Sequence, residues 1–176
     1  MNWIVAVAAL VAAVDLPQRV RQLREYTSSQ RYTVAAGLVA VGVVVAAIAS
    51  LLLDALDVSS PTMEVAAGMV LILWSLTAFF RWSDDAAPAA RPGAVGGLVP
   101  GLFPIVFTPP VGVLTLAVAA RNGYPAPILG LLIAAGVLAA PNAVAAAIGR
   151  RPARLASATA GVVLGIVMMT DGVLAV

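Results

Sequence analysis

The chain has 176 residues, of which 62% are hydrophobic and 10% are charged, and its net charge is +2 at pH 7. A mean hydropathy of +1.04 is far above that of a soluble domain, which needs polar side chains to cover its surface. Because Cys and His are both absent, disulfides, His- or Cys-ligated zinc and haem, and Ser-His-Asp or Cys-His catalysis are excluded. The small net charge disfavours nucleic acid as a partner. We expect an integral membrane protein that is not an enzyme and uses no metal or other cofactor.

Six apolar runs predict six membrane-spanning helices, since a bilayer core of about 30 Å requires about 20 apolar residues per helix. In chain order they cover about 2–15, 33–55, 62–82, 98–120, 125–147 and 155–175. The first run is short and lacks the basic start of a secretory signal peptide, so we do not expect cleavage. The next segment, QRVRQLREYTSSQR, is amphipathic and rich in Arg, which favours a position at the membrane interface.

The sequence also matches itself at a fixed offset of 93 residues, which places helices one, two and three on helices four, five and six. Chance is the alternative, because both halves are rich in Ala, Val, Leu and Gly. A chance match is not expected to align prolines as well. The aligned pairs include Asp15/Thr108, Pro17/Pro110, Gly37/Gly130 and Gly68/Gly161.

Since each half would contain an odd number of spans, the two halves must cross the membrane in opposite senses. The predicted fold is therefore an all-α integral membrane protein with six transmembrane helices, arranged as two inverted-topology three-helix repeats. The repeats cover about 1–90 and 91–176 of a single transmembrane domain. Most of the glycines are expected to allow close helix packing; these are Gly37, Gly42, Gly68, Gly130, Gly136 and Gly161.

The charges indicate the orientation of this domain. Every basic residue is Arg, and nine of the ten lie in or beside loops one, three and five. Opposite them stands Arg121, while Asp54, Asp57 and Glu64 cluster near the loop between spans two and three. By the positive-inside rule the odd loops are cytoplasmic, so both termini face outward from a bacterial inner (plasma) membrane. Glu64 is expected to complement the dipole at the start of the third helix, and Asp171 to lie near the outer end of the sixth.

The segment GLFPIVFTPPVGVLTL, residues 101–116, has three prolines and no charge. Proline inside a helix costs about 3 kcal/mol, so prolines at matching places in the two halves predict interruptions in helices one and four. Inverted-repeat transporters bind their solutes at such interruptions, where backbone groups are freed. The candidate substrate-binding residues are Asp15, Pro17, Thr108, Pro109, Pro110 and Asn142.

Each of these residues also has a structural interpretation. Asp15 could end a short helix at the cytoplasmic interface, paired with Arg19 one turn later. Thr108 could satisfy the carbonyls freed by the prolines, and Asn142 could hydrogen-bond between helices. Arg19, Arg21 and Arg24 are candidates for binding a phosphate headgroup, although simple anchoring at the membrane surface explains them as well.

Four segments carry a family resemblance: VDLPQRV (14–20), LDVSSPTMEVAAGMVLILWSL (56–76), FPIVFTPPVGVLTLAVA (103–119) and TDGV (170–173). With them, the chain resembles the MarC family of small bacterial six-helix membrane proteins, within the LysE-like group of exporters. The resemblance covers nearly the whole chain and implies a transporter-like fold. The family follows its Asp-Pro with Gly-Asn and an apolar half-helix, whereas this chain has Gln18, Arg19, Arg21 and Arg24. The acidic Glu-x-Gly-Asp-type motif of metal-exporting relatives is absent, which disfavours metal-ion transport.

The expected function is a secondary transporter that exports a small solute by rocking of the two repeats. One alternative is a non-transporting membrane subunit of a larger complex, favoured by the scarcity of buried charge. Another is a carrier of lipids or lipid-linked intermediates. Expected partners are membrane lipids, a small-molecule substrate, and either a second copy of the chain or another membrane protein.

Overall fold

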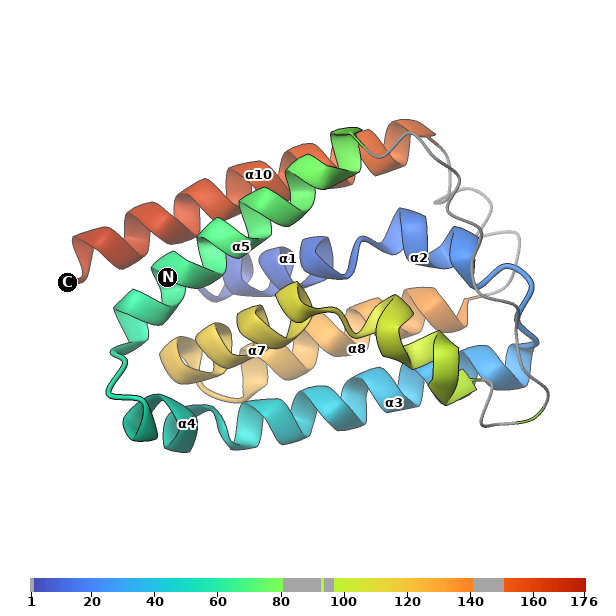
Figure 1. Cartoon of the computed structure of the whole chain (residues 1–176), viewed down its shortest axis with the longest axis horizontal. Coiled ribbons are helices and arrows are strands. Elements are labelled where there is room, and N and C mark those ends of the chain that lie inside the picture. The colour runs from blue at the N-terminus through green and yellow to red at the C-terminus, as the bar shows by residue number, and fades with distance from the viewer. Residues whose placement is uncertain (1, 81–92, 94–96, 141–150) are drawn as a thin grey trace.

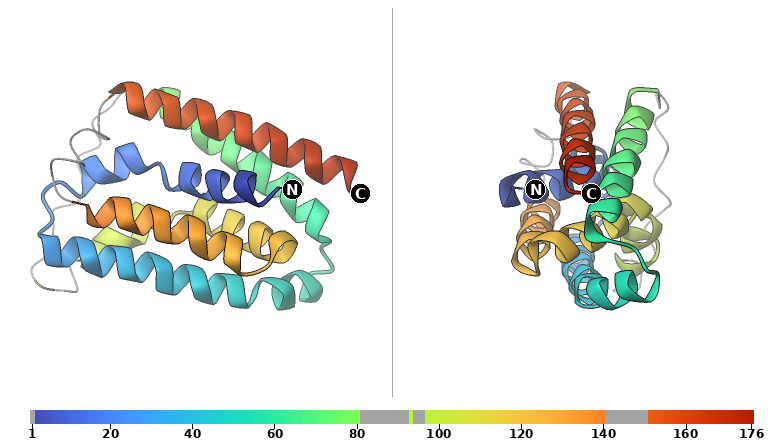
Figure 2. Two further views of the ribbon diagram at one scale, coloured as in Figure 1. Left: turned by 180° about the vertical axis from the view of Figure 1, so that it is seen from behind. Right: turned by 90° about the vertical axis from the view of Figure 1, so that its left-hand side faces the viewer.

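The computed structural model describes residues 2–80, 93, 97–140 and 151–176, and within them every regular element is helical. The first half forms α1 (Trp3–Val14), α2 (Leu16–Gln22), α3 (Ser28–Ala47), α4 (Ala49–Ala55) and α5 (Ser60–Phe80). The second half forms η1 (Gly97–Val106), α7 (Pro109–Asn122), α8 (Pro125–Ala139) and α10 (Arg151–Leu174). Most of these helices run along the long axis of the molecule, and both termini lie at the end where α4 and the α7–α8 turn are found (Figures 1 and 2).

The helices have the length and composition that membrane spans require. Four are long and apolar enough to cross a bilayer: Trp3–Gln22, Ser28–Ala47, Ser60–Thr77 and Pro152–Leu174. A fifth is added when η1 and α7, which meet at 73°, are taken as one broken span. The all-α class is thus confirmed for the described residues, with four or five helices long and apolar enough to cross a membrane. The predicted fifth span matches Pro125–Ala139, which is apolar but shorter, and its remaining residues, 141–147, lie outside the described residues.

The first span differs from its prediction. The helix resumes at Leu16 after a single interrupting residue, and the Arg-rich segment that was expected at the interface begins inside the bundle. The reason is the spacing of Leu16, Val20 and Leu23, which places three apolar side chains on one helical face. All three are buried in the main core. The predicted boundary at residue 15 is therefore the site of an interruption and not the end of the span.

The second span begins earlier than predicted because polar groups at its start are satisfied locally. Thr27 and Gln30 form a capping box, in which Gln30 N donates to Thr27 Oγ1 at 3.3 Å and Thr27 N to Gln30 Oε1 at 3.0 Å. Arg31 is buried as well. Its guanidinium donates to the carbonyls of Leu23 and Arg24 at 3.1 and 3.3 Å, so this cation can enter the bundle without losing hydrogen bonds.

Helices α5 and α10 lie side by side along most of their length (Figure 1). Small residues allow this close approach. A methyl group at Gly68 would lie 2.6 Å from the carbonyl oxygen of Gly165, and one at Gly165 would lie 2.6 Å from Ile72 Cγ1. Gly161, one turn before Gly165, faces Ser75 in the same way. The predicted packing role is confirmed for Gly68 and Gly161.

Of the other four glycines that were predicted to allow packing, three contact a neighbouring helix. A methyl group at Gly37 on α3 would lie 2.7 Å from Leu102 of η1, and one at Gly130 on α8 would lie 3.1 Å from Leu10 of α1. Gly42 faces Leu131. Among the described residues, no atom lies within 4 Å of the place where a side chain at Gly136 would begin. Within that part of the chain the face of α8 at Gly136 is open, so the predicted packing role of Gly136 is not supported there.

These contacts predict a sharp difference between glycines. The substitution Gly165→Ala should lower the free energy of unfolding by about 1–3 kcal/mol, because the new methyl group overlaps backbone atoms of α5 that cannot move independently. Gly136→Ala is the matched control: its methyl group enters open space, so its effect should be neutral or slightly stabilising. Thermal denaturation in detergent measures both variants. Equal melting temperatures for the two variants would contradict this explanation of the α5–α10 contact.

Candidate functional site: two interrupted helices and two buried charge clusters

The first interruption is a single residue, Asp15, between α1 and α2. Its backbone is left-handed, with φ 51° and ψ 56°, and its N–H donates to the carbonyl of Ala12 at 3.0 Å, which ends α1. Leu16 and Pro17 then begin α2. Proline fits at the first positions of a helix because the N–H it lacks would have no partner there. Asp15 is 6% exposed, so a carboxylate stands inside the bundle at this point.

The second interruption lies between η1 and α7. Thr108 is extended, with φ −100° and ψ 162°, and Pro109 and Pro110 are the first two residues of α7. The adjacent prolines therefore do not bend a continuous helix: they start a new one, where neither missing N–H is needed. This explains how an apolar segment without charge accommodates adjacent prolines, the strongest helix breakers. Figure 1 shows both interruptions about halfway along the long axis.

Asp15 and Thr108, which the offset of 93 residues aligns, occupy the same position, immediately before the second half-helix. Neither side chain caps that helix, and both residues are buried. Thr108 Oγ1 has no hydrogen-bond partner within the described part of the chain. The interpretation that Thr108 satisfies freed carbonyls is thus wrong, and its hydroxyl is left available at the start of α7.

Charged and aromatic side chains from three helices gather around the first interruption. Arg19 is 5% exposed, donates to Gln22 Oε1 at 2.7 Å, and places its guanidinium carbon 5.7 Å from the centre of the Trp74 ring on α5. The charge of Asp15 interacts with those of Arg19 and Arg154, the latter on α10. Asp15 and Arg19 are thus near enough for their charges to interact, and both lie within the bundle instead of at an exposed helix end.

The three arginines predicted to bind a headgroup do not share one surface. Arg19 is buried, while Arg21 and Arg24 are exposed. Tyr26, in the turn that follows, is buried too, and burial raises the pKa of its phenol. Asn142, the remaining substrate-binding candidate, lies outside the described residues. Among the described residues, no group of three or more His, Cys, Asp or Glu side chains could hold a metal ion.

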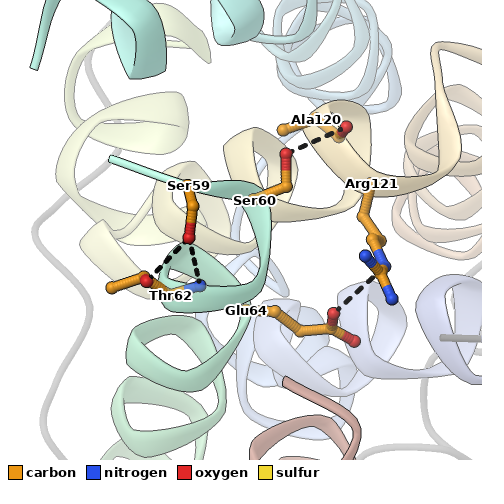
Figure 3. Close-up of polar contacts among 6 residues, drawn as sticks. All are labelled: Ser59, Ser60, Thr62, Glu64, Ala120 and Arg121. Carbon is orange, nitrogen blue, oxygen red and sulfur yellow. Dashed lines mark hydrogen bonds and ion pairs between the residues drawn. The ribbon is translucent and has the colours of Figure 1, made fainter. Parts of the chain in front are cut away.

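The structure adds a second charge cluster, which the sequence did not identify as a site. Glu64 on α5 is fully buried, and its Oε2 lies 3.5 Å from Nε of Arg121 in the last turn of α7 (Figure 3). Neither carboxylate oxygen has a hydrogen-bond partner among the described residues. Asp171 on α10 and the amino terminus also interact electrostatically with Glu64. The signal was present in the sequence, because Glu64 precedes the buried Gly68 and Leu71 by one and two helical turns.

Two hydroxyl groups hold the start of α5 in place around this pair (Figure 3). Ser59 Oγ lies 2.8 Å from Thr62 Oγ1 and accepts from Thr62 N at 3.4 Å, so it caps α5. Ser60 Oγ donates to the carbonyl of Ala120 on α7 at 3.5 Å. The beginning of α5 is therefore tied to the end of α7 by an ion pair and a weak hydrogen bond.

A groove of about 760 Å³ lies between α1, α2, α8 and α10. Its lining includes Pro17 of the first interruption and is otherwise apolar except for Ser157. Neither Asp15 nor Thr108 lines it. The groove can accept lipid chains, but it offers a polar solute few hydrogen-bonding groups.

The chain matches no protein-family model, no curated protein and no solved structure. Its function is therefore inferred from its own geometry.

The Glu64–Arg121 ion pair predicts that a second substitution, at Glu64, restores the stability that a substitution at Arg121 removes. Arg121→Met leaves a buried carboxylate without its partner and should lower the free energy of unfolding by about 3 kcal/mol. Adding Glu64→Gln removes the unpaired charge, so the double variant should recover most of the lost stability. Thermal denaturation of Arg121→Met, Glu64→Gln and the double variant at one pH tests this. Two independent, additive losses would show that the two side chains are not coupled.

Proposed function

We propose that this protein is a secondary transporter that exports a small solute, with its solute site at the two interruptions. The observation that carries the proposal is the pair of buried interruptions at equivalent positions of the two halves. Irregular backbone at membrane depth is tolerated where protein covers it or where it lines a water-filled cavity. A single interruption has no functional implication by itself, whereas an aligned pair is typical of transporters that are built from inverted repeats.

The helix contacts support a repeat independently of the sequence match. Helix α1 packs on α8, and its counterpart η1 packs on α3, the counterpart of α8. The glycines at these contacts are Gly130 and Gly37, which the offset aligns. In the same way, Gly68 on α5 faces α10, and the aligned Gly161 on α10 faces α5. In a duplicated unit, a contact made by a helix of the first half with a helix of the second is expected to recur with the two equivalent helices in swapped roles.

The directions of the helices support inversion. In Figure 1, α1 and α2 run away from the end that holds the termini, while η1 and α7 run toward it. Helices α3 and α8 are opposed, and so are α5 and α10. The two sets of three spans would then cross the membrane in opposite senses, with the Arg-rich ends of loops one, three and five in the cytoplasm and both termini outside.

The polar groups at the interruptions indicate which chemical groups the solute carries. The amino end of α7 offers a positive partial charge but few N–H donors, because Pro109 and Pro110 have no N–H and Gly112 N donates to the carbonyl of Thr108. Thr108 Oγ1 is an available hydroxyl beside it. Across the paired interruption, Asp15 carries a carboxylate near Arg19 and Arg154. This combination fits a small polar solute with acceptor oxygens at one end. The resemblance to the MarC family agrees with an exporter, and a homodimer in lipid remains our expectation for the assembly.

Accessibility tests transport without knowledge of the solute. Because the chain has no native Cys, Thr108→Cys introduces a single thiol at a buried position. A transporter must expose its site to each side in turn, so a membrane-impermeant thiol reagent should label Thr108→Cys both in right-side-out and in inverted vesicles. Leu132→Cys, on a 50% exposed face of α8, should remain unlabelled from both sides in lipid.

Variants of the interruptions complete this test. In the Thr108→Cys background, Asp15→Asn and Pro110→Ala should abolish labelling from one side while gel filtration still shows a folded protein. Asp57→Asn is the matched control, because Asp57 has the same left-handed backbone, with φ 52°, but is exposed. A non-transporting subunit would be labelled from at most one side in every variant, and that result would refute the proposal.

A further inference from the structure

Glu64 occupies a position that the proposed solute site does not explain. Its carboxylate is fully buried and its partner, Arg121, is 32% exposed. The two residues belong to different helices, α5 and α7, and the ion pair is the charged contact between these helices in the described structure. A buried carboxylate is costly once its cationic partner is removed. Motion that carries Arg121 away from Glu64 therefore favours protonation of Glu64.

Helix α7 connects this pair to the second interruption. It begins directly after Thr108 and ends one residue after Arg121, a distance of about 20 Å at 1.5 Å per residue. Because α7 is one uninterrupted helix, a tilt at its amino end displaces Arg121 at its other end. The solute site and the Glu64–Arg121 pair thus lie at the two ends of one rigid element.

The surrounding charges favour a proton over a metal ion at Glu64. Arg121 on α7 repels a metal cation, while Asp171 on α10 and the amino terminus before α1 are the other charged groups that act on Glu64. A sodium or divalent ion also needs several oxygen ligands, and no cluster of acids that could supply them occurs among the described residues. A proton needs one carboxylate oxygen and displaces the ion pair directly.

We propose that Glu64 is the proton-binding site of this transporter, and that the Glu64–Arg121 ion pair is a lock between α5 and α7 that protonation opens. In the locked state, ionised Glu64 holds Arg121. When one proton binds, the carboxylate becomes a neutral carboxylic acid, Arg121 keeps its charge and turns to water, and α7 is free to tilt. This inference rests on the proposed function and names its coupling ion.

The experiment measures the separation of the two helices as a function of pH. Spin labels are attached to Ala66→Cys on α5 and Tyr124→Cys after α7, both at exposed positions, and electron–electron distances are recorded in lipid nanodiscs between about pH 8 and about pH 5. The distance distribution of the otherwise unchanged protein should shift to longer values as the pH falls. With Glu64→Gln, which mimics the protonated side chain, the longer distances should be present at every pH. Asp54→Asn, an exposed acid at the same end, should leave the shift intact.

The outcomes separate this inference from the proposed function. Absence of a pH shift in the unchanged protein overturns the proton lock, and this measurement does not depend on whether Glu64→Gln folds. A shift that persists in Glu64→Gln overturns it too, because another group would then be responsible. If either result is found while Thr108→Cys is labelled from both sides, transport stands and only its coupling to Glu64 fails. One-sided labelling of Thr108→Cys indicates that the transporter proposal itself has failed.

Discussion

The hydrocarbon of a bilayer offers no hydrogen-bond partners, and this constraint governs how the chain can be interrupted. A helix may stop within the membrane only if protein covers the backbone groups that are freed. At the first interruption α1 ends and α2 begins with one residue between them, whereas the second includes non-helical backbone at Phe103 within η1 as well as the two residues before α7. Pro17, Pro109 and Pro110 stand at the first positions of the new helices, where their missing N–H groups cost nothing. The prolines therefore define half-helices without leaving donors unsatisfied.

Covering these interruptions requires the other helices to come close, and small residues make this possible. Gly37 lets α3 approach η1, and Gly130 lets α8 approach α1. A side chain at either position would force the covering helix outward. The same principle brings α5 and α10 together through Gly68 and Gly165. These four glycines are thus explained by close contact between helices.

The two halves that we propose to be repeats differ in charge. At the offset of 93 residues, Glu64 falls on Ser157, Arg121 on Ser28 and Asp171 on Ala78. The first half has Asp15 at its interruption, while the second has Thr108. Under the proposed duplication, this difference assigns different tasks to the halves, with the proposed solute site at the interruptions and the Glu64–Arg121 pair at the end where the termini lie.

The sequence predicted the helical class, most spans and both interruptions, because apolar length and proline position are local signals. It did not predict that Leu16–Gln22 enters the bundle, since the arginines dominate the composition of that segment while Leu16, Val20 and Leu23 decide its packing. Glu64 was interpreted as a complement to the helix dipole because its partner, Arg121, is remote in the chain. Contacts between distant residues depend on the tertiary fold, and local patterns do not reveal them.

The proposed site requires that the two interruptions lie at one depth in the membrane and share a polar environment. Spin labels at Asp15→Cys and Thr108→Cys, each the single thiol of its chain, test this when their collision rates with oxygen and with a water-soluble nickel chelate are compared. We expect equal depths near the middle of the bilayer, with access for the chelate at both positions. A label at position 15 in the headgroup region and a label at position 108 in dry hydrocarbon would contradict a shared site, since Asp15 would then end a short helix at the membrane surface.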